Sequence, residues 1–112
     1  LKNRTIGQQA SRTLASLLEG VVKNGSGSKA YIEGYKIGGK TGTAQKFENG
    51  AIAQGKYVSS FLGFFPANDP QYLSLVIVDA PQGAYYGSVV AAPAAREIFQ
   101  GIIDAKAIEP FE

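Results

Sequence analysis

The sequence of 112 residues has no histidine, no cysteine, no methionine and no tryptophan. Without histidine and cysteine the chain cannot form a Ser-His-Asp triad, a cysteine nucleophile or a typical structural zinc site. It also lacks an apolar run of the roughly 18 residues that a membrane-spanning helix requires. Because there is no starting methionine and the chain begins abruptly at Leu1, we expect a fragment or a processed product, whose membrane anchor lies elsewhere.

Charge is sparse and scattered along the chain. Eleven basic and nine acidic residues give a formal net charge of +2, and 45% of the residues are apolar. No run of like charges indicates nucleic acid or an acidic membrane surface as a partner. We therefore expect a single globular unit over residues 1–112 that contacts neither nucleic acid nor membrane.

Hydrophobic spacing predicts one helix near each end of the chain. In the segment 6–23 the apolar residues recur at helical intervals, and Asn24-Gly25 supplies a stop. The segment 89–107 again has helical spacing, with Pro93 tolerable only in the first turn. Its regularly spaced apolar positions are Val90, Ala94, Ile98 and Ile102.

Three strands are predicted between these helices. The segment 31–50 is rich in glycine and in β-branched or aromatic residues, so it is expected to be extended and to turn at Asn49-Gly50. The segments 56–66 and 71–80 are expected to be antiparallel neighbours, because the four residues that join them contain asparagine and proline.

The third of these strands decides the expected architecture. It is apolar from Leu73 to Val78 except at Ser74, which predicts burial on both faces. The order helix, three strands, helix predicts an α/β (α+β) sandwich, with a three-stranded antiparallel sheet flanked by N- and C-terminal helices. The strand that contains Lys40 is expected at an edge of this sheet.

The stretch GYKIGGKTGTAQ, residues 34–45, fits two motifs. Its first part has the spacing G-x-x-x-x-G-K-T of a phosphate loop. A phosphate loop requires a buried strand before it and a helix that begins at its Lys-Thr. The preceding residues 28–33 are polar, and Gly42-Thr43 are poor residues for a first helical turn. We therefore expect no nucleotide binding, and interpret Asp79 as a false match to a magnesium site.

The second motif is the Lys-Thr-Gly of serine enzymes that attack peptides and β-lactams. On a strand, Thr41 and Thr43 project to one face and Lys40 to the other. Two hydroxyls with a nearby cation suit a carboxylate. The glycines of the same strand allow another backbone or a ligand to approach closely, as strand addition by a peptide requires. Spacing alone also fits a glycine-rich edge strand without a function.

Further segments follow this motif in a fixed order. GYKIGGKTGTAQ, YVSSFLGFFPANDP, LSLVIVDAP and YYGSVVAAPAAREIF together resemble the C-terminal part of the transpeptidase domain of class B penicillin-binding proteins. The resemblance covers essentially the whole chain. It implies a D,D-transpeptidase that cross-links peptidoglycan stem peptides through a serine acyl-enzyme and that β-lactams block. It also implies no cofactor or metal, and a place on the extracytoplasmic face of the bacterial membrane.

The resemblance also assigns roles by position. Lys40, Thr41 and Gly42 match the third motif of the family. Lys40 would be catalytic, as an electrostatic and hydrogen-bonding partner of the second motif. The hydroxyls of Thr41 and Thr43 would bind the substrate's terminal carboxylate, in a site that Gly42 also lines. The Thr43 backbone N–H would be an oxyanion donor, so Thr43 would be both catalytic and substrate-binding.

The chain departs from the family pattern at the other two motifs. Ser-x-Asn is absent, and the one Ser-x-x-Lys, from Ser26 to Lys29, lies in a glycine-serine turn without the burial that activates a nucleophile. We expect a solvated loop there, an upstream partner segment that carries both motifs, and an inactive chain on its own. A serine β-lactamase, a β-lactam-sensing receptor domain and a non-catalytic binding or structural domain stay open as alternatives.

The remaining conspicuous residues have ordinary expectations. Strand aromatics beside helices are usually core, which applies to Tyr57, Phe61, Phe64 and Phe65. Tyr85 and Tyr86 belong to a loop where they could form the rim of a cleft. Glu97 and Asp104 are expected on the solvated face of the last helix.

Overall fold

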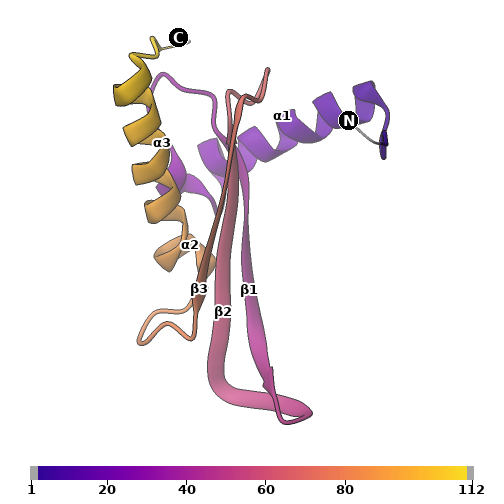
Figure 1. Cartoon of the computed structure of the whole chain (residues 1–112), viewed down its shortest axis with the longest axis vertical. Helices are drawn as coiled ribbons and strands as arrows, with labels where there is room; N and C mark the ends of the chain where they lie inside the picture. Colours follow the sequence, from indigo (N-terminus) through magenta and orange to yellow (C-terminus); the bar gives the residue numbers. More distant parts are fainter. Residues whose placement is uncertain (1–2, 111–112) are drawn as a thin grey trace.

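A computed structural model describes residues 3–110 and confirms the predicted order of elements (Figure 1). The elements are helix α1 (Gln8–Asn24), the 3-10 turn η1 (Ser28–Ala30), strands β1 (Gly38–Glu48), β2 (Ala51–Phe65) and β3 (Tyr72–Asp79), and helices α2 (Gly87–Val90) and α3 (Ala92–Lys106). Within residues 3–110, no helix is both long enough and apolar enough to cross a bilayer.

The three strands form one antiparallel sheet in the order β1-β2-β3, so β1 is an edge strand, as predicted. Asn49 and Gly50 both have positive φ, at 52° and 78°, which is the geometry of a two-residue hairpin turn. β2 begins at Ala51, earlier than predicted, because it forms the second arm of this hairpin. The far end of the hairpin projects beyond all the helices (Figure 1).

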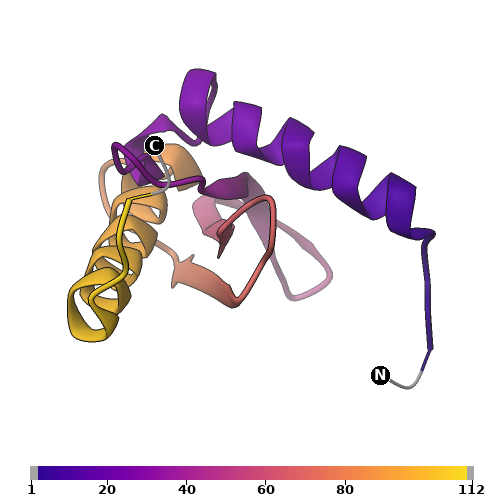
Figure 2. The same cartoon turned by 90° about the horizontal axis from the view of Figure 1, so that it is seen from above.

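The two faces of the sheet differ, and we call them the α3 face and the open face. The α3 face is formed by the side chains of Ser59, Phe61, Phe65, Tyr72, Val76 and Val78. The open face is formed by those of Leu62, Phe64, Leu73, Leu75 and Ile77. Seen from above, α3 stands on one side of the strands, and the N-terminal half of α1 extends away on another (Figure 2).

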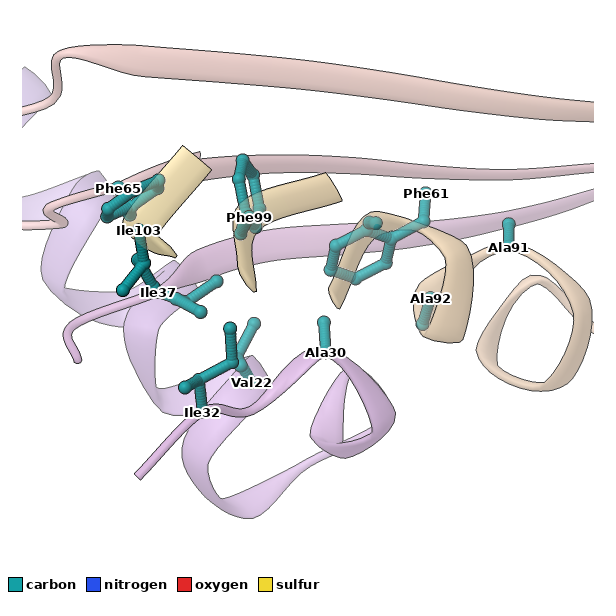
Figure 3. Packing of buried hydrophobic residues seen from close by; sticks show 11 residues of the cluster. Val22, Ala30, Ile32, Ile37, Phe61, Phe65, Ala91, Ala92, Phe99 and Ile103 are labelled. Carbon is teal, nitrogen blue, oxygen red and sulfur yellow. The ribbon is translucent and has the colours of Figure 1, made fainter. Parts of the chain in front are cut away.

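The hydrophobic core lies on the α3 face (Figure 3). Phe61, Phe65 and Phe99 are completely buried, and the rings of Phe65 and Phe99 meet edge-on with centroids 5.0 Å apart. Val22 of α1 and Ala30 of η1 join the same cluster. The prediction of burial is confirmed for Phe61 and Phe65 in this cluster and for Phe64 on the open face, outside it. Tyr57 is only half-buried.

The prediction that β3 is buried on both faces is wrong. Leu73, Leu75 and Ile77 are 71%, 57% and 60% exposed, while the alternate residues Val76 and Val78 pack against the core. The strand alternates because it has α3 beside one face, whereas nothing in residues 3–110 covers its other face. The continuous apolar run in β3 therefore indicates apolar side chains on both faces, but it does not show that both faces are buried.

Both predicted helices form, with differences in what they bury. In α1 only Val22 is buried, and Leu17 is 65% exposed. In α3 the predicted apolar line is shifted: Ile98 is 45% exposed, and Val90 belongs to the separate helix α2. The buried residues of α3 are Ala92, Ala95, Phe99 and Ile103. The Phe99 ring has the most apolar area to bury, so it determines which side of the helix faces the sheet.

Candidate functional site

The site begins with the glycine pair that precedes Lys40 on β1. A Cβ atom at Gly38 would lie 2.5 Å from the ring of Phe64, and one at Gly39 would lie 2.5 Å from the ring of Phe61. Both distances are far shorter than van der Waals contact. The two rings pack on opposite faces of β1, so the glycine pair fixes the strand where the Lys-Thr-Gly segment starts.

Lys40 is exposed, and its ammonium group turns back along β1. Its Nζ donates to the backbone oxygen of Thr41 at 2.8 Å and lies 3.5 Å from the Thr41 hydroxyl oxygen. Both partners are neutral. An ammonium group has three donors, so Lys40 retains capacity for an acidic group or a further acceptor beside the strand.

Thr41 and Thr43 share the α3 face of β1, as strand alternation predicted. The hydroxyl oxygens of Thr41 and Ser26 lie 3.4 Å apart. The hydroxyl oxygen of Thr43 accepts a hydrogen bond from the backbone N–H of Gly87, at 3.0 Å. Three separate segments therefore meet at the two threonines.

Ser26 is a neighbour of the site that sequence reasoning missed. It was expected in a solvated loop, and it is indeed exposed, in the turn between α1 and η1. Its hydroxyl nevertheless lies against Thr41, fifteen positions away, rather than forming a pair with Lys29. The only sequence signal at Ser26 was the Ser-x-x-Lys match, which pointed to a different chemistry.

The backbone of Gly42 is contacted on both faces of the strand. A Cβ atom at Gly42 would lie 2.5 Å from the hydroxyl of Ser60, on the open face. On the α3 face, a Cβ atom at Gly87 would lie 2.6 Å from the Gly42 carbonyl oxygen. The strand is thus held between a serine hydroxyl and the start of α2 at the position next to Thr43.

Aromatic rings stand beside this part of the sheet. Tyr57 and Tyr85 stack with centroids 4.0 Å apart and planes 8° from parallel, and Tyr86 is tilted against Tyr85 at 4.6 Å. A hydrogen bond with Tyr86, followed by the charges that Tyr86 and Tyr57 would carry, raises the pKa of Tyr85 to about 12. Tyr85 is therefore a neutral phenol at physiological pH.

The phosphate-loop alternative does not fit this geometry. Lys40 and Thr41 lie within β1 and not at the start of a helix, so no helix dipole or row of N–H groups converges on them. The suspected magnesium residue Asp79 forms an ion pair with Lys46, with 2.9 Å between nitrogen and oxygen. Across the described part of the chain, no cluster of three acidic, histidine or cysteine side chains could hold a metal ion.

Comparison with known proteins identifies the family to which this fold belongs. Residues 1–100 match the family model of the penicillin-binding protein transpeptidase domain. The chain belongs to this family.

Individual relatives agree with that assignment. The chain is 40% identical to a peptidoglycan D,D-transpeptidase FtsI homolog of Chlorokybus atmophyticus and 39% identical to the stage V sporulation protein D of Bacillus subtilis. These matches cover 96% and 97% of the chain but only 16% and 17% of the relatives. The chain therefore spans about a sixth of the length of these proteins.

Solved structures show the same fold. The transpeptidase domain of Burkholderia pseudomallei penicillin-binding protein 3 matches with a TM-score of 0.86 and 31% identity, over 98% of this chain and 34% of that one. Penicillin-binding protein 3 of Mycobacterium tuberculosis, solved in complex with ampicillin, matches with a TM-score of 0.83 and 28% identity, over 96% of this chain and 26% of that one. A three-stranded antiparallel sheet with flanking helices is thus confirmed as part of that domain fold.

Proposed function

We propose that residues 1–112 are the C-terminal portion of the transpeptidase domain of a peptidoglycan D,D-transpeptidase. The complete enzyme would cross-link stem peptides through a serine acyl-enzyme and would be acylated by β-lactams. One observation carries the proposal: an edge strand, β1, presents the hydroxyls of Thr41 and Thr43 on one face, with the Lys40 ammonium group beside Thr41. An extended peptide can pair with such an edge.

Each residue of the motif has a role in this proposal. The Thr41 and Thr43 hydroxyls bind the carboxylate that ends the stem peptide or that a β-lactam carries, and the Ser26 hydroxyl beside Thr41 extends this polar row. Lys40 supplies positive charge and a hydrogen bond to the second motif. Gly42 leaves room for the Ser60 hydroxyl against the strand that lines the site, and the backbone N–H of Thr43 stabilises the oxyanion of the tetrahedral intermediate.

The nucleophile is proposed to lie in an upstream segment that packs on the open face. Leu73, Leu75 and Ile77 are exposed there. Leu14 and Leu18 of α1 also line a groove of about 370 Å³ together with Phe64 and Leu73. Burial of such apolar surface contributes roughly 25 cal/mol per Å². The upstream segment is therefore the partner that completes the domain, and it would also anchor the protein at the extracytoplasmic face of the membrane.

Labelling with a fluorescent penicillin tests the proposal. The 112-residue chain alone should carry no label that survives denaturation, because its only Ser-x-x-Lys lies in an exposed turn. When the upstream segment is supplied as a second chain, label should appear on that second chain. Lys40→Ala should slow labelling, whereas Lys23→Ala, at the exposed end of α1, should leave the rate unchanged.

Three results would contradict the proposal. A penicilloyl adduct mapped to Ser26 of the chain alone would show that the nucleophile lies in this chain and not in an upstream segment. Rapid hydrolytic turnover of penicillin by the assembled domain would favour a β-lactamase. Saturable binding of magnesium-ATP that Lys40→Ala abolishes would show that the motif is a phosphate loop.

A further inference from the structure

We infer that Gly87 is a positioning residue for the Thr43 hydroxyl. Its backbone N–H holds Thr43 in the orientation in which the hydroxyl proton is left for a ligand carboxylate. This inference rests on the proposed function, since it gives a direction to a hydroxyl that the proposal makes a carboxylate ligand. It goes further because Gly87 lies outside the Lys-Thr-Gly motif, forty-four positions from Thr43.

The hydrogen-bonding capacity of a hydroxyl explains the orientation. A threonine hydroxyl has one donor and two acceptor lone pairs. The Gly87 N–H occupies one lone pair of the Thr43 oxygen at 3.0 Å, so the hydroxyl proton points away from that nitrogen. A carboxylate is an acceptor only, and it needs a donor that already points towards it.

The loop that carries Gly87 is tied to β2 at several points. The N–H of Ala80 donates to the backbone oxygen of Tyr57 at 2.8 Å, which fixes the start of the loop. The hydroxyl of Ser59 donates to the backbone oxygen of Tyr85, and the rings of Tyr57 and Tyr85 stack. Ser59 is completely buried. These contacts place the Gly87 N–H over β1 independently of any ligand.

Glycine is required at this position by the closeness of the loop and the strand. A Cβ atom at residue 87 would collide with the backbone oxygen of Ser60 on β2, and it would lie 2.6 Å from the carbonyl oxygen and 3.2 Å from the nitrogen of Gly42 on β1. All three are backbone atoms, and they cannot move aside as the end of a side chain can. Any side chain must therefore push the loop away from β1, and this lengthens the bond from residue 87 to Thr43.

The test uses the complete transpeptidase domain that contains this chain, and two probes that differ only in the carboxylate. Benzylpenicillin and its methyl ester are compared by the second-order rate of acylation, measured by mass spectrometry. The ratio of the two rates reports carboxylate recognition. Movement of the oxyanion site would slow both probes equally and leave the ratio unchanged.

Gly87→Ala should lower this ratio by about tenfold, the effect of losing one well-directed hydrogen bond to a charged group. Thr43→Val should lower it at least as far, and Thr43→Ser, which keeps the hydroxyl, should largely preserve it. The double variant Gly87→Ala with Thr43→Val should be no worse than Thr43→Val alone. Gly101→Ala on α3 is the matched control, because a Cβ atom there meets nothing within 4 Å.

Ser59→Ala provides a second route if Gly87→Ala does not fold. It removes the tie to Tyr85 without adding an atom, and it should lower the ratio by about threefold. An unchanged ratio in either variant, with both rates reduced, would overturn the inference, as would independent effects in the double variant. A wild-type domain that benzylpenicillin does not acylate would instead overturn the proposed function itself.

Discussion

The two faces of one small sheet have opposite properties, although the same strands form them. On the α3 face Phe61 and Phe65 are completely buried, whereas on the open face Leu73 and Leu75 are more than half exposed. Both faces are apolar in sequence. The α3 face finds its covering helix within the chain, whereas α1 reaches the open face only near Phe64 and leaves Leu75 and Ile77 exposed. This accords with a proposed upstream partner.

The comparison extends to the site. Thr41, Thr43 and Gly87 meet on the α3 face, so the hydroxyl side of the Lys-Thr-Gly strand is assembled by this chain. Lys40 pairs in register with Leu62 of the open face. The proposed partner of the Lys40 ammonium group is the second motif, which is expected in the upstream segment. The α3 face thus builds the half of the proposed site that needs no other segment.

The largest expected effect is on stability, and it separates the two faces. Phe61→Ala should destabilise the chain by about 3–5 kcal/mol, because a completely buried ring leaves a cavity. Leu75→Ala, at a 57% exposed position, should change the stability of the chain alone by no more than about 0.5 kcal/mol. Urea unfolding followed by circular dichroism measures both values.

The complete domain sharpens this result. There Leu75→Ala should become costly, by about 2–5 kcal/mol, if the upstream segment buries the open face. Phe61→Ala should cost a similar amount in both forms. An effect of Leu75→Ala that is equally small in the complete domain would show that the open face stays in contact with solvent.

The next effect is on catalysis at the strand between the faces. Gly42→Val in the complete domain should reduce the rate of acylation more than Thr43→Ala, because the added side chain collides with Ser60 at a position where a Cβ atom would already lie 2.5 Å from its hydroxyl. Displacement of the strand should move the Thr43 N–H out of the proposed oxyanion site. Loss of one oxyanion donor reduces the rate by about 10²–10³. Thr43→Ala keeps that N–H and loses only the hydroxyl.

Acylation by a penicillin, followed over time, gives the two second-order rates. Ala51→Val, at the exposed start of β2, is a control for adding a branched side chain to a strand. Equal rates for Gly42→Val and Thr43→Ala would refute the proposed geometry of the strand.

The local sequence pattern predicted most of the fold, because helices, turns and strand alternation depend on residues that are neighbours in the sequence. The helical spacing of α1, the Asn49-Gly50 turn and the alternation of Thr41 and Thr43 were all readable in this way. The contacts of Ser26 and Gly87 were not, because they join segments far apart in the chain. The exposure of β3 was misjudged for a related reason: composition shows that a face is apolar, but only the tertiary fold shows whether it is covered.

A smaller effect is expected at the end of the open face, where Lys46 forms an ion pair with Asp79. The hydrogen bond to Asp79 raises the pKa of Lys46 above its ordinary value of 10.5. A raised lysine pKa means that the contribution to stability is complete below about pH 10. This contribution of the ion pair is lost as the pH rises through the pKa of Lys46 in the folded state.

Lys46→Met removes the ion pair and should therefore lower the thermal midpoint slightly at neutral pH. The difference from the wild type should shrink as the pH rises beyond about 11, where the amine loses its charge. Lys29→Met, in the 3-10 turn η1, is the control for removing an exposed lysine. A difference that stays constant across this range would mean that Lys46 contributes through packing and not through its charge.

The smallest effect concerns the aromatic rings at the corresponding end of the α3 face, and it changes a titration rather than stability or rate. A hydrogen bond with Tyr86 and the charges of the neighbouring phenolates raise the pKa of Tyr85 to about 12. The neutral phenol is thus favoured by the fold, and this contribution is present below about pH 10 and lost as the pH rises towards 12. The chain has six tyrosines and no tryptophan, so ultraviolet absorbance reports tyrosinate directly. Absorbance is read immediately after rapid jumps to a series of pH values. The titration of the folded chain should then show a separate step towards pH 12. Tyr85→Phe should remove this step, and Tyr72→Phe, at a ring stacked on Phe65, should retain it. Titration of all six side chains in one step near pH 10, with the circular dichroism of the folded state intact, would mean that Tyr57, Tyr85 and Tyr86 do not remain packed together in solution.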